Sequence, residues 1–148
     1  MNLVESIEQY NENGIFFCEP IKNNVMNEGI FIRILYSSPN LVMNGIYLLV
    51  SLNDVTCEKY YSKYRCHFNV SHHKNIIENL RIIEEGLLKK YELTDKIPQF
   101  KIYEHMKVGN MKIFNDIGNN LKCTFILKIS GIWETQTNYG LTYKFIKV

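Results

Sequence analysis

The segment that decides the fold closes the chain and reads LKCTFILKIS (121–130), GIWETQTNYG (131–140) and LTYKFIKV (141–148). In the first part, apolar side chains at odd positions alternate with lysines and other residues at even positions. The last part alternates in the same way. Because successive side chains of a strand point to opposite faces, both parts are predicted to be β-strands. Gly131 and Gly140 bound the loop between them, so we predict a β-hairpin with one apolar and one cationic face.

The length and composition indicate a single globular domain with its own core. The chain has 148 residues, of which 46% are hydrophobic and 22% are charged. It contains no run of about 18 apolar residues and no apolar signal segment near its start, so we expect an intracellular protein without a membrane span. Alanine is absent, while residues with A/T-rich codons (Asn, Ile, Lys, Tyr) are abundant. This composition is typical of an AT-rich genome.

Charge is unevenly distributed along the chain. Residues 1–28 contain five glutamates and one lysine, a net charge of −4, whereas residues 29–148 contain 16 basic and 10 acidic residues, a net charge of +6. We therefore predict an acidic N-terminal arm at 1–28 and a basic domain at 29–148. The basic domain is expected to attract polyanions.

The residues that most often bind metals or catalyse reactions form no familiar motif. Four cysteines are widely spaced: Cys18, Cys57, Cys66 and Cys123. In a protein that is not secreted they are predicted to be reduced and mostly buried. Cys57, Cys66 and His67 lack the spacing of a zinc site, so we expect no metal and no cofactor. Glu84 and Glu85 are expected to face solvent. We predict no enzyme activity, because no nucleophile with its base and no positioned carboxylate pair is recognisable.

The rest of the chain is predicted to be mostly strands with one long helix. Alternation and β-branched content favour strands at 15–21, 29–36, 45–52, 63–70, 99–104 and 110–114, with a polar loop at 53–62 and the strand at 45–52 buried. From 73 to 91 the apolar period becomes helical, with a stripe of Ile76, Leu80, Ile83, Leu87 and Tyr91. Ser71 is a suitable N-cap for this helix.

This order of elements predicts a mainly β (α+β) fold. Three strands followed by a helix and further strands fit an OB-like antiparallel β-barrel with one long helix and a C-terminal β-hairpin. A different α+β sheet with the helix across one face is the alternative.

The closing residues carry a resemblance to a known group of proteins. The pattern G-I-W, a polar loop and then Y-G-L-T-Y-K-F, within 131–148, resembles the C-terminal segment of single-stranded-DNA-binding proteins of large double-stranded DNA viruses. The resemblance covers roughly the last thirty residues. It implies an OB-like protein that binds single-stranded DNA in viral replication or recombination, without catalysis.

Binding to single-stranded DNA or RNA requires cations for the phosphates and exposed aromatic rings for the bases. The candidate cations on the predicted strands are Arg33, Lys63, Arg65, Lys122, Lys128 and Lys144. The candidate stacking rings are Trp133, Tyr139 and Tyr143. The alternative interpretation is that the lysines are ordinary solvated side chains, that Tyr143 belongs to the core and that Trp133 caps the barrel.

A second hypothesis assigns the protein a structural role. It is then a viral assembly protein that forms homo-oligomers when residues 1–28 dock on the basic surface of a neighbouring copy. The two hypotheses differ in the partner expected at the basic surface, which is a nucleic acid in the first and another protein chain in the second.

Overall fold

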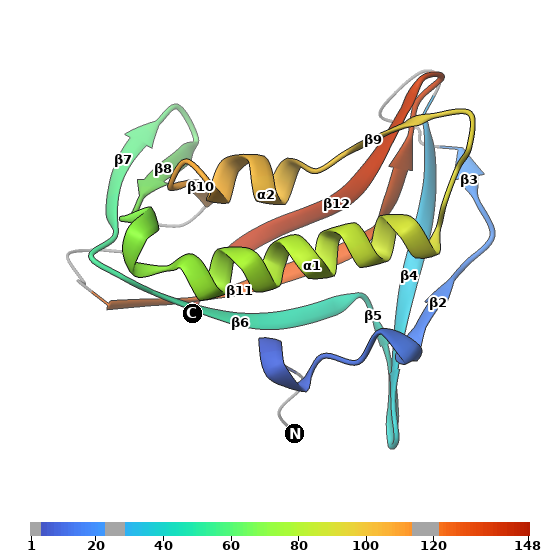
Figure 1. The fold of residues 1–148 in the computed structure, drawn as a ribbon, viewed down its shortest axis with the longest axis horizontal. Coiled ribbons are helices and arrows are strands. Elements are labelled where there is room, and N and C mark those ends of the chain that lie inside the picture. The colour runs from blue at the N-terminus through green and yellow to red at the C-terminus, as the bar shows by residue number, and fades with distance from the viewer. Residues whose placement is uncertain (1–3, 23–28, 114–121) are drawn as a thin grey trace.

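A computed structural model describes residues 4–22, 29–113 and 122–148. These residues form two β-sheets and two α-helices, and both helices lie on the same side of the larger sheet (Figure 1). The described chain is therefore mainly β, with helices packed on the larger sheet. This confirms the predicted mainly β (α+β) fold class.

The strands are β1 (Glu5–Ser6), β2 (Ile15–Phe17), β3 (Ile21–Lys22), β4 (Ile30–Ser38), β5 (Leu41–Asn44), β6 (Ile46–Asn53), β7 (Thr56–Tyr60), β8 (Lys63–His67), β9 (Ile97–Gln99), β10 (Asn110–Ile113), β11 (Lys122–Glu134) and β12 (Asn138–Lys147). The α-helices are α1 (Lys74–Lys90) and α2 (Lys101–Met106), and 3-10 turns occupy η1 (Ile7–Gln9), η2 (Glu12–Gly14) and η3 (Val70–His72).

Strand β11 is the centre of the larger sheet. Its partner on one edge is β12, in the predicted antiparallel hairpin, although both strands extend through the glycines expected to bound the loop. On the other edge β11 pairs with β6 over 122–129 and with β4 over 131–134. A bulge between Ile129 and Gly131 separates these two stretches. Strand β1 extends the sheet beyond β6 and β9 extends it beyond β12, while β2, β3 and β5 pair with β4.

The corner between β5 and β6 requires glycine. Gly45 has a φ of +111°, and a Cβ at this position would lie 3.0 Å from the backbone oxygen of Ile129 in β11. A larger residue would combine a strained backbone with a close contact to the central strand. Gly45 thus allows the chain to turn out of the β4–β5 hairpin and run along β11.

Neither sheet closes on itself among the described residues. The larger sheet ends at β1 and β9, and the smaller sheet consists of β10, β8 and β7 in that order. The OB-like barrel predicted from the sequence is therefore not confirmed, whereas the strand-rich fold is.

The predicted alternation of the closing hairpin is confirmed. Buried side chains occupy every second position of β11: Cys123, Phe125, Leu127 and Ile129. The positions between them are half-buried: Thr124, Ile126 and Lys128. In β12, Leu141 and Phe145 are buried while Lys144 is exposed. One face of the hairpin therefore forms the core, and the other does not.

Helix α1 covers the core face over the predicted range, but its N-terminus differs from the prediction. Leu80, Ile83 and Leu87 of the predicted stripe are buried. Ser71 lies in the 3-10 turn η3, and His73 occupies the N-cap position. The ring of His73 accepts a hydrogen bond from the backbone N–H of Asn53 at 2.9 Å, so a contact distant in sequence determines where the helix begins.

The predicted strand at 99–104 is wrong beyond Gln99, since α2 begins at Lys101. Ile102 and Met106 are both buried, which is the i, i+4 spacing of a helix. The start of α2 is held by Glu84 of α1, whose carboxylate accepts the backbone N–H groups of Ile102 (3.0 Å) and Tyr103 (2.9 Å).

The expectation that Glu84 faces solvent is wrong. The residue is only 1% exposed because it packs between the two helices. Burial raises the pKa of its carboxyl to about 7, against the opposing effect of the two backbone N–H donors. Glu85, the next residue, is exposed and pairs with Arg81, as expected for a surface side chain.

The smaller sheet carries a disulfide that the sequence did not predict. Cys57 and Cys66 are direct partners across β7 and β8 and are joined by an S–S bond. The expectation of reduced cysteines is wrong for this pair, because residues 56–60, predicted as loop, form a strand that places Cys57 opposite Cys66. Cys123 is buried, as expected, and Cys18 is half-buried.

The described part of the acidic segment, residues 4–22, belongs to the larger sheet. Strand β1 runs parallel to β6, and β2 and β3 are antiparallel to β4. The ring of Tyr10 stacks on Tyr36 with ring centroids 5.8 Å apart, and the hydroxyl of Tyr36 donates to Glu5 at 2.9 Å. Residues 4–22 are therefore packed against the basic part of the chain.

Candidate functional site

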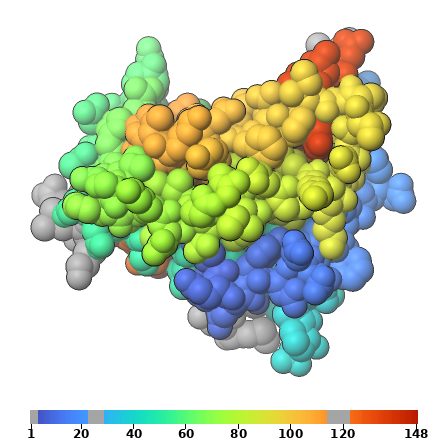
Figure 2. Space-filling view, in the orientation of Figure 1, coloured from blue at the N-terminus to red at the C-terminus, as the bar shows by residue number. Residues whose placement is uncertain are grey.

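The two faces of the larger sheet differ in what covers them. The segment from α1 through β9 to α2 forms a continuous layer over one face (Figure 2). Neither α-helix covers the opposite face, which we call the open face. Residues paired directly across neighbouring strands point to the same face. By this rule the open face carries Phe31, Arg33, Tyr47, Leu49, Ile126, Lys128, Trp133, Thr142, Lys144 and Ile146.

Two lysines lie directly opposite each other in the middle of the open face. Lys128 of β11 is the cross-strand partner of Lys144 of β12, and Tyr47 of β6 is the partner of Lys128 on the other side. The ammonium of Lys128 lies 5.5 Å from the centre of the Tyr47 ring. Neither lysine pairs with a carboxylate of the described residues. Like charges in this position repel each other, so the pair favours an anion from outside the chain.

Two aromatic rings form a second cross-strand pair further along the open face. Trp133 of β11 is the direct partner of Phe31 of β4, and both are half-buried. Gly140 makes room for the indole, because a Cβ at this position would come within 2.7 Å of Cζ2 of Trp133. The ammonium of Lys101 lies 5.7 Å from the centre of the Trp133 ring. Aromatic rings packed over sheet glycines stabilise a sheet, and they also present a π-face beside a cation.

The structure divides the predicted binding residues between two sheets. Arg33, Lys128, Trp133 and Lys144 share the open face of the larger sheet, where Arg33 donates a hydrogen bond to the side chain of Asn44 at 2.7 Å. Lys122 is the first residue of β11, and its side chain lies outside the described residues. Lys63 and Arg65 are exposed on β8 of the smaller sheet. The predicted cations therefore do not lie on a single surface.

The two tyrosines of β12 point to the opposite side from Lys144. Tyr139 is only 4% exposed, so its predicted role as a stacking ring is wrong. Tyr143 is half-buried, and its hydroxyl lies 3.3 Å from Nδ1 of His105 in α2. Burial, with smaller contributions from Glu84 and Glu104, raises the pKa of Tyr143 to about 12. The shift thus moves its titration further from neutral pH, where the hydroxyl is protonated in any case.

Phe31 and Tyr47 lie on the open face but were not identified as candidate stacking rings from the sequence. Tyr47 lies in the run GIYLLVSL, which the sequence predicts to be a buried strand. In the structure Ile46, Leu48, Val50 and Leu52 are buried, whereas Tyr47 and Leu49 are half-buried and Ser51 is exposed. The polar residues Ser51 and Asn53, on the same side as Tyr47, are the signal that indicates a half-open strand.

Comparison with models of protein families, with curated proteins and with solved structures finds no match. The C-terminal resemblance to viral DNA-binding proteins therefore stays a prediction. Within residues 4–22, 29–113 and 122–148, no helix is long and apolar enough to span a bilayer. In the same part of the chain, no three His, Cys, Asp or Glu side chains are close enough to share a metal ion.

Proposed function

We propose that the open face of the larger sheet binds single-stranded nucleic acid, DNA in the first place, without catalysing a reaction. The observation that carries this proposal is the Lys128–Lys144 pair, which lies beside the Tyr47 ring and has no carboxylate partner in the described chain. Phosphates of a bound strand would neutralise the two charges. An aromatic ring beside them offers a stacking surface for a base.

The spacing along β11 favours an extended ligand. Lys128 and Trp133 are five residues apart, which corresponds to about 15 Å at the rise of a β-strand. A small anion at the lysine pair would not reach the Trp133–Phe31 pair. A single strand that follows β11 would contact both, with its phosphates at the lysines and its bases on the rings. Arg33, which lies between them on β4, would add a third cation.

A role in viral DNA replication or recombination, inside an infected cell, is the finer part of the proposal. It is supported by the closing pattern of residues 131–148 and by the AT-rich composition. Disulfides are typical of oxidising compartments, so the Cys57–Cys66 bond weighs against an intracellular location. The proposal requires an open sheet face, and it does not depend on a closed OB-like barrel.

An apolar cavity on the open face favours a second candidate function, self-association as a structural or assembly protein. The cavity has a volume of about 500 Å³ and is lined by Val4, Tyr47, Ile126 and residues 41–44. Val42 is 61% exposed beside it. Apolar surface of this kind is typical of protein contacts. In this case Val42→Asp would shift the sedimentation of the protein to a smaller species.

Titration of a labelled oligo(dT) strand, followed by fluorescence anisotropy at two salt concentrations, tests the proposal. The double variant Lys128→Glu/Lys144→Glu is expected to lose about 10- to 100-fold in affinity at low salt, because it replaces two phosphate contacts by repulsion. Lys74→Glu/Lys89→Glu makes the same change of charge at the two ends of α1 and is expected to bind like the wild type.

Two results would contradict nucleic-acid binding at the open face. One is unchanged affinity in Lys128→Glu/Lys144→Glu. The other is an equal loss in both double variants, which would mean that only the net charge of the protein matters.

A further inference from the structure

A second basic site lies away from the open face, where α2, the smaller sheet and β12 meet. Two adjoining cavities of about 260 Å³ each are found there, and they share His105, Met111 and Lys112 as walls. Arg65, His67 and Asn110 complete one cavity. Tyr143, Lys144 and Phe145 complete the other. We call the two together the α2 cleft.

The lining of the α2 cleft is basic. Arg65 of β8 and Lys112 of β10 are direct cross-strand partners, and neither pairs with a carboxylate of the described residues. The two imidazoles, His67 and His105, add ring nitrogens that can take part in hydrogen bonds. The acidic residues around the cleft include Glu58, opposite Arg65 on β7, Glu104, which precedes His105 in α2, and Glu84, whose charge acts on Tyr143. None of these three glutamates lines the cavities.

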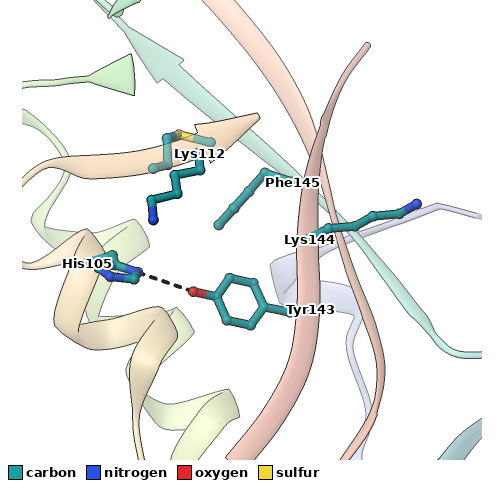
Figure 3. A pocket seen from close by; sticks show the side chains of 6 residues that line it. His105, Lys112, Tyr143, Lys144 and Phe145 are labelled. Atoms are coloured by element: carbon teal, nitrogen blue, oxygen red, sulfur yellow. Dashed lines mark hydrogen bonds between the residues drawn. The ribbon is translucent and has the colours of Figure 1, made fainter. Parts of the chain in front are cut away.

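Several donors converge on the same space. The ammonium of Lys112, the ring of His105 and the hydroxyl of Tyr143 all point into the cavity, whereas Lys144 points away from it (Figure 3). The Tyr143 hydroxyl lies 3.3 Å from His105 Nδ1. The Tyr143 hydroxyl is protonated at neutral pH, as tyrosines ordinarily are, and it can therefore donate a hydrogen bond. A compact anion in the cleft can therefore be bound by the ammonium of Lys112 and the guanidinium of Arg65, with the Tyr143 hydroxyl as a neutral donor.

The two cavities differ in chemistry. The one beside Arg65, His67 and Lys112 suits an anion. The neighbouring one has the rings of Tyr143 and Phe145 in its wall, edge to face at 6.1 Å between centroids, and suits a flat organic group. We propose that the α2 cleft binds a nucleoside monophosphate, with the phosphate at Arg65 and Lys112 and the base at Tyr143. The ligand is a free nucleotide or the phosphorylated end of a strand. This proposal is independent of the open face.

Isothermal titration with thymidine 5′-monophosphate, and with thymidine as the uncharged reference, tests the α2 cleft. The wild-type protein is expected to bind the nucleotide at least about 10-fold more tightly than the nucleoside, because charge-assisted bonds hold the phosphate. Arg65→Ala/Lys112→Ala is expected to abolish this preference, and Lys112→Arg to keep it. Lys59→Ala/Lys89→Ala removes the same charge from exposed sites and is expected to bind like the wild type. Equal binding of nucleotide and nucleoside, or an unaffected Arg65→Ala/Lys112→Ala variant, would overturn the proposal.

Competition with oligo(dT) identifies the source of the phosphate. If an oligonucleotide with a 5′-phosphate displaces the nucleotide and one with a 5′-hydroxyl does not, the cleft holds a strand end. If neither displaces it, the cleft holds a free nucleotide. Displacement by both to the same extent would contradict a site for a phosphate monoester. In Lys128→Glu, which changes the open face at a residue that lines neither cavity, the nucleotide should still bind, so failure of one proposal is distinguishable from failure of the other.

Discussion

The Lys128–Lys144 pair of the larger sheet and the Arg65–Lys112 pair of the smaller sheet repeat the same arrangement of charge. In both, two cations are direct cross-strand partners without a carboxylate partner among the described residues. Their surroundings differ. The first pair lies on a face that no α-helix covers, in line with aromatic rings along β11. The second lies beside two cavities walled by α2 and β12.

The comparison indicates that the shape of the surface around the two cations, rather than the charge pair itself, determines which anion can bind. A flat face with charges and rings spread over about 15 Å of strand suits a polymer. A cleft in which donors converge suits a single phosphate group. The two sites are distinguishable by substitutions that should weaken binding at one site and leave binding at the other unchanged.

Removal of the Glu84 carboxylate is expected to have the largest effect on stability, and among the two binding sites to impair the α2 cleft only. Glu84→Ala leaves one buried and one partly buried N–H group at the start of α2 without acceptors, which costs about 3 kcal/mol of unfolding free energy. His105 loses its position, so nucleotide binding should disappear while oligo(dT) affinity is kept. Urea unfolding and the two titrations measure this. Glu85→Ala, the exposed neighbour, should change stability by less than about 0.5 kcal/mol.

The same carboxyl predicts how the stability of the protein depends on pH. Burial raises the pKa of Glu84 from 4.5 to about 7, so the folded state holds its proton more tightly than the unfolded state. The unfolding free energy contributed by this group is therefore highest below pH 4.5 and falls as the pH rises to about 7, by about 3 kcal/mol. Unfolding at a series of pH values, compared with Glu84→Gln, measures the difference. An identical slope in Glu84→Gln would rule Glu84 out as its source.

Reduction of the Cys57–Cys66 disulfide should weaken the smaller sheet and spare the larger one. The bond closes a loop with a sequence separation of 9. Loss of this constraint is expected to lower the unfolding free energy by about 2.5 kcal/mol. Nucleotide binding should weaken, because Arg65 lies beside Cys66 on β8, while oligo(dT) binding stays unchanged. Thermal unfolding with and without a thiol reductant measures the effect, and Cys57→Ala/Cys66→Ala should show no response to the reductant.

Trp133→Ala should weaken oligo(dT) binding by about 1–2 kcal/mol, which is the contribution of one stacked base. The logarithmic salt dependence of binding should stay the same, because the indole carries no charge. Lys144→Ala should instead make that slope shallower by about 0.7, as expected when the protein neutralises one phosphate fewer on a single strand. Anisotropy titrations over a range of salt concentrations distinguish the two. A shallower slope in Trp133→Ala would contradict stacking as its role.

The smallest expected effect is a gain in unfolding free energy when one lysine of either pair is changed to glutamate. The same substitution should weaken ligand binding. Lys144→Glu replaces a like-charge pair by an attractive one with Lys128, and Lys112→Glu does the same opposite Arg65. Each change is expected to raise the unfolding free energy by about 0.5 kcal/mol. Each should also weaken binding at its own site. A variant that loses both stability and binding would show that the lysine is held by a partner within the chain.

The closing hairpin and the long helix could be predicted because their signals are local. Strict alternation from 121 to 129 determines which side chains of β11 face the core, and the stripe at Leu80, Ile83 and Leu87 identifies the buried side of α1. The mainly β fold follows from such patterns. That the sheet stays open could not be predicted from local patterns, because barrel closure depends on contacts between strands far apart in the sequence.

The sites were harder to predict because they depend on register and on distant partners. Cys57 meets Cys66 only because β7 forms, in a stretch that reads as polar loop. Helix α2 exists where a strand was expected because Glu84, eighteen residues before Ile102, supplies the acceptor for its first N–H groups. Lys128 and Lys144 lie on one face of a sheet, as the alternation of the hairpin predicts. Their separation from Arg65 could be seen only once the strands were assigned to two sheets.

Trp133 allows the central claim to be measured directly, because it is the single tryptophan of the chain and lies on the open face. Its fluorescence is recorded in the unmodified protein during titration with oligo(dT). If a single strand binds the open face, the emission should change in step with the anisotropy of the labelled strand and recover at high salt. Thymidine 5′-monophosphate, bound in the α2 cleft, should leave it unchanged. Binding of oligo(dT) with no change in the emission of Trp133 would contradict nucleic-acid binding at the open face.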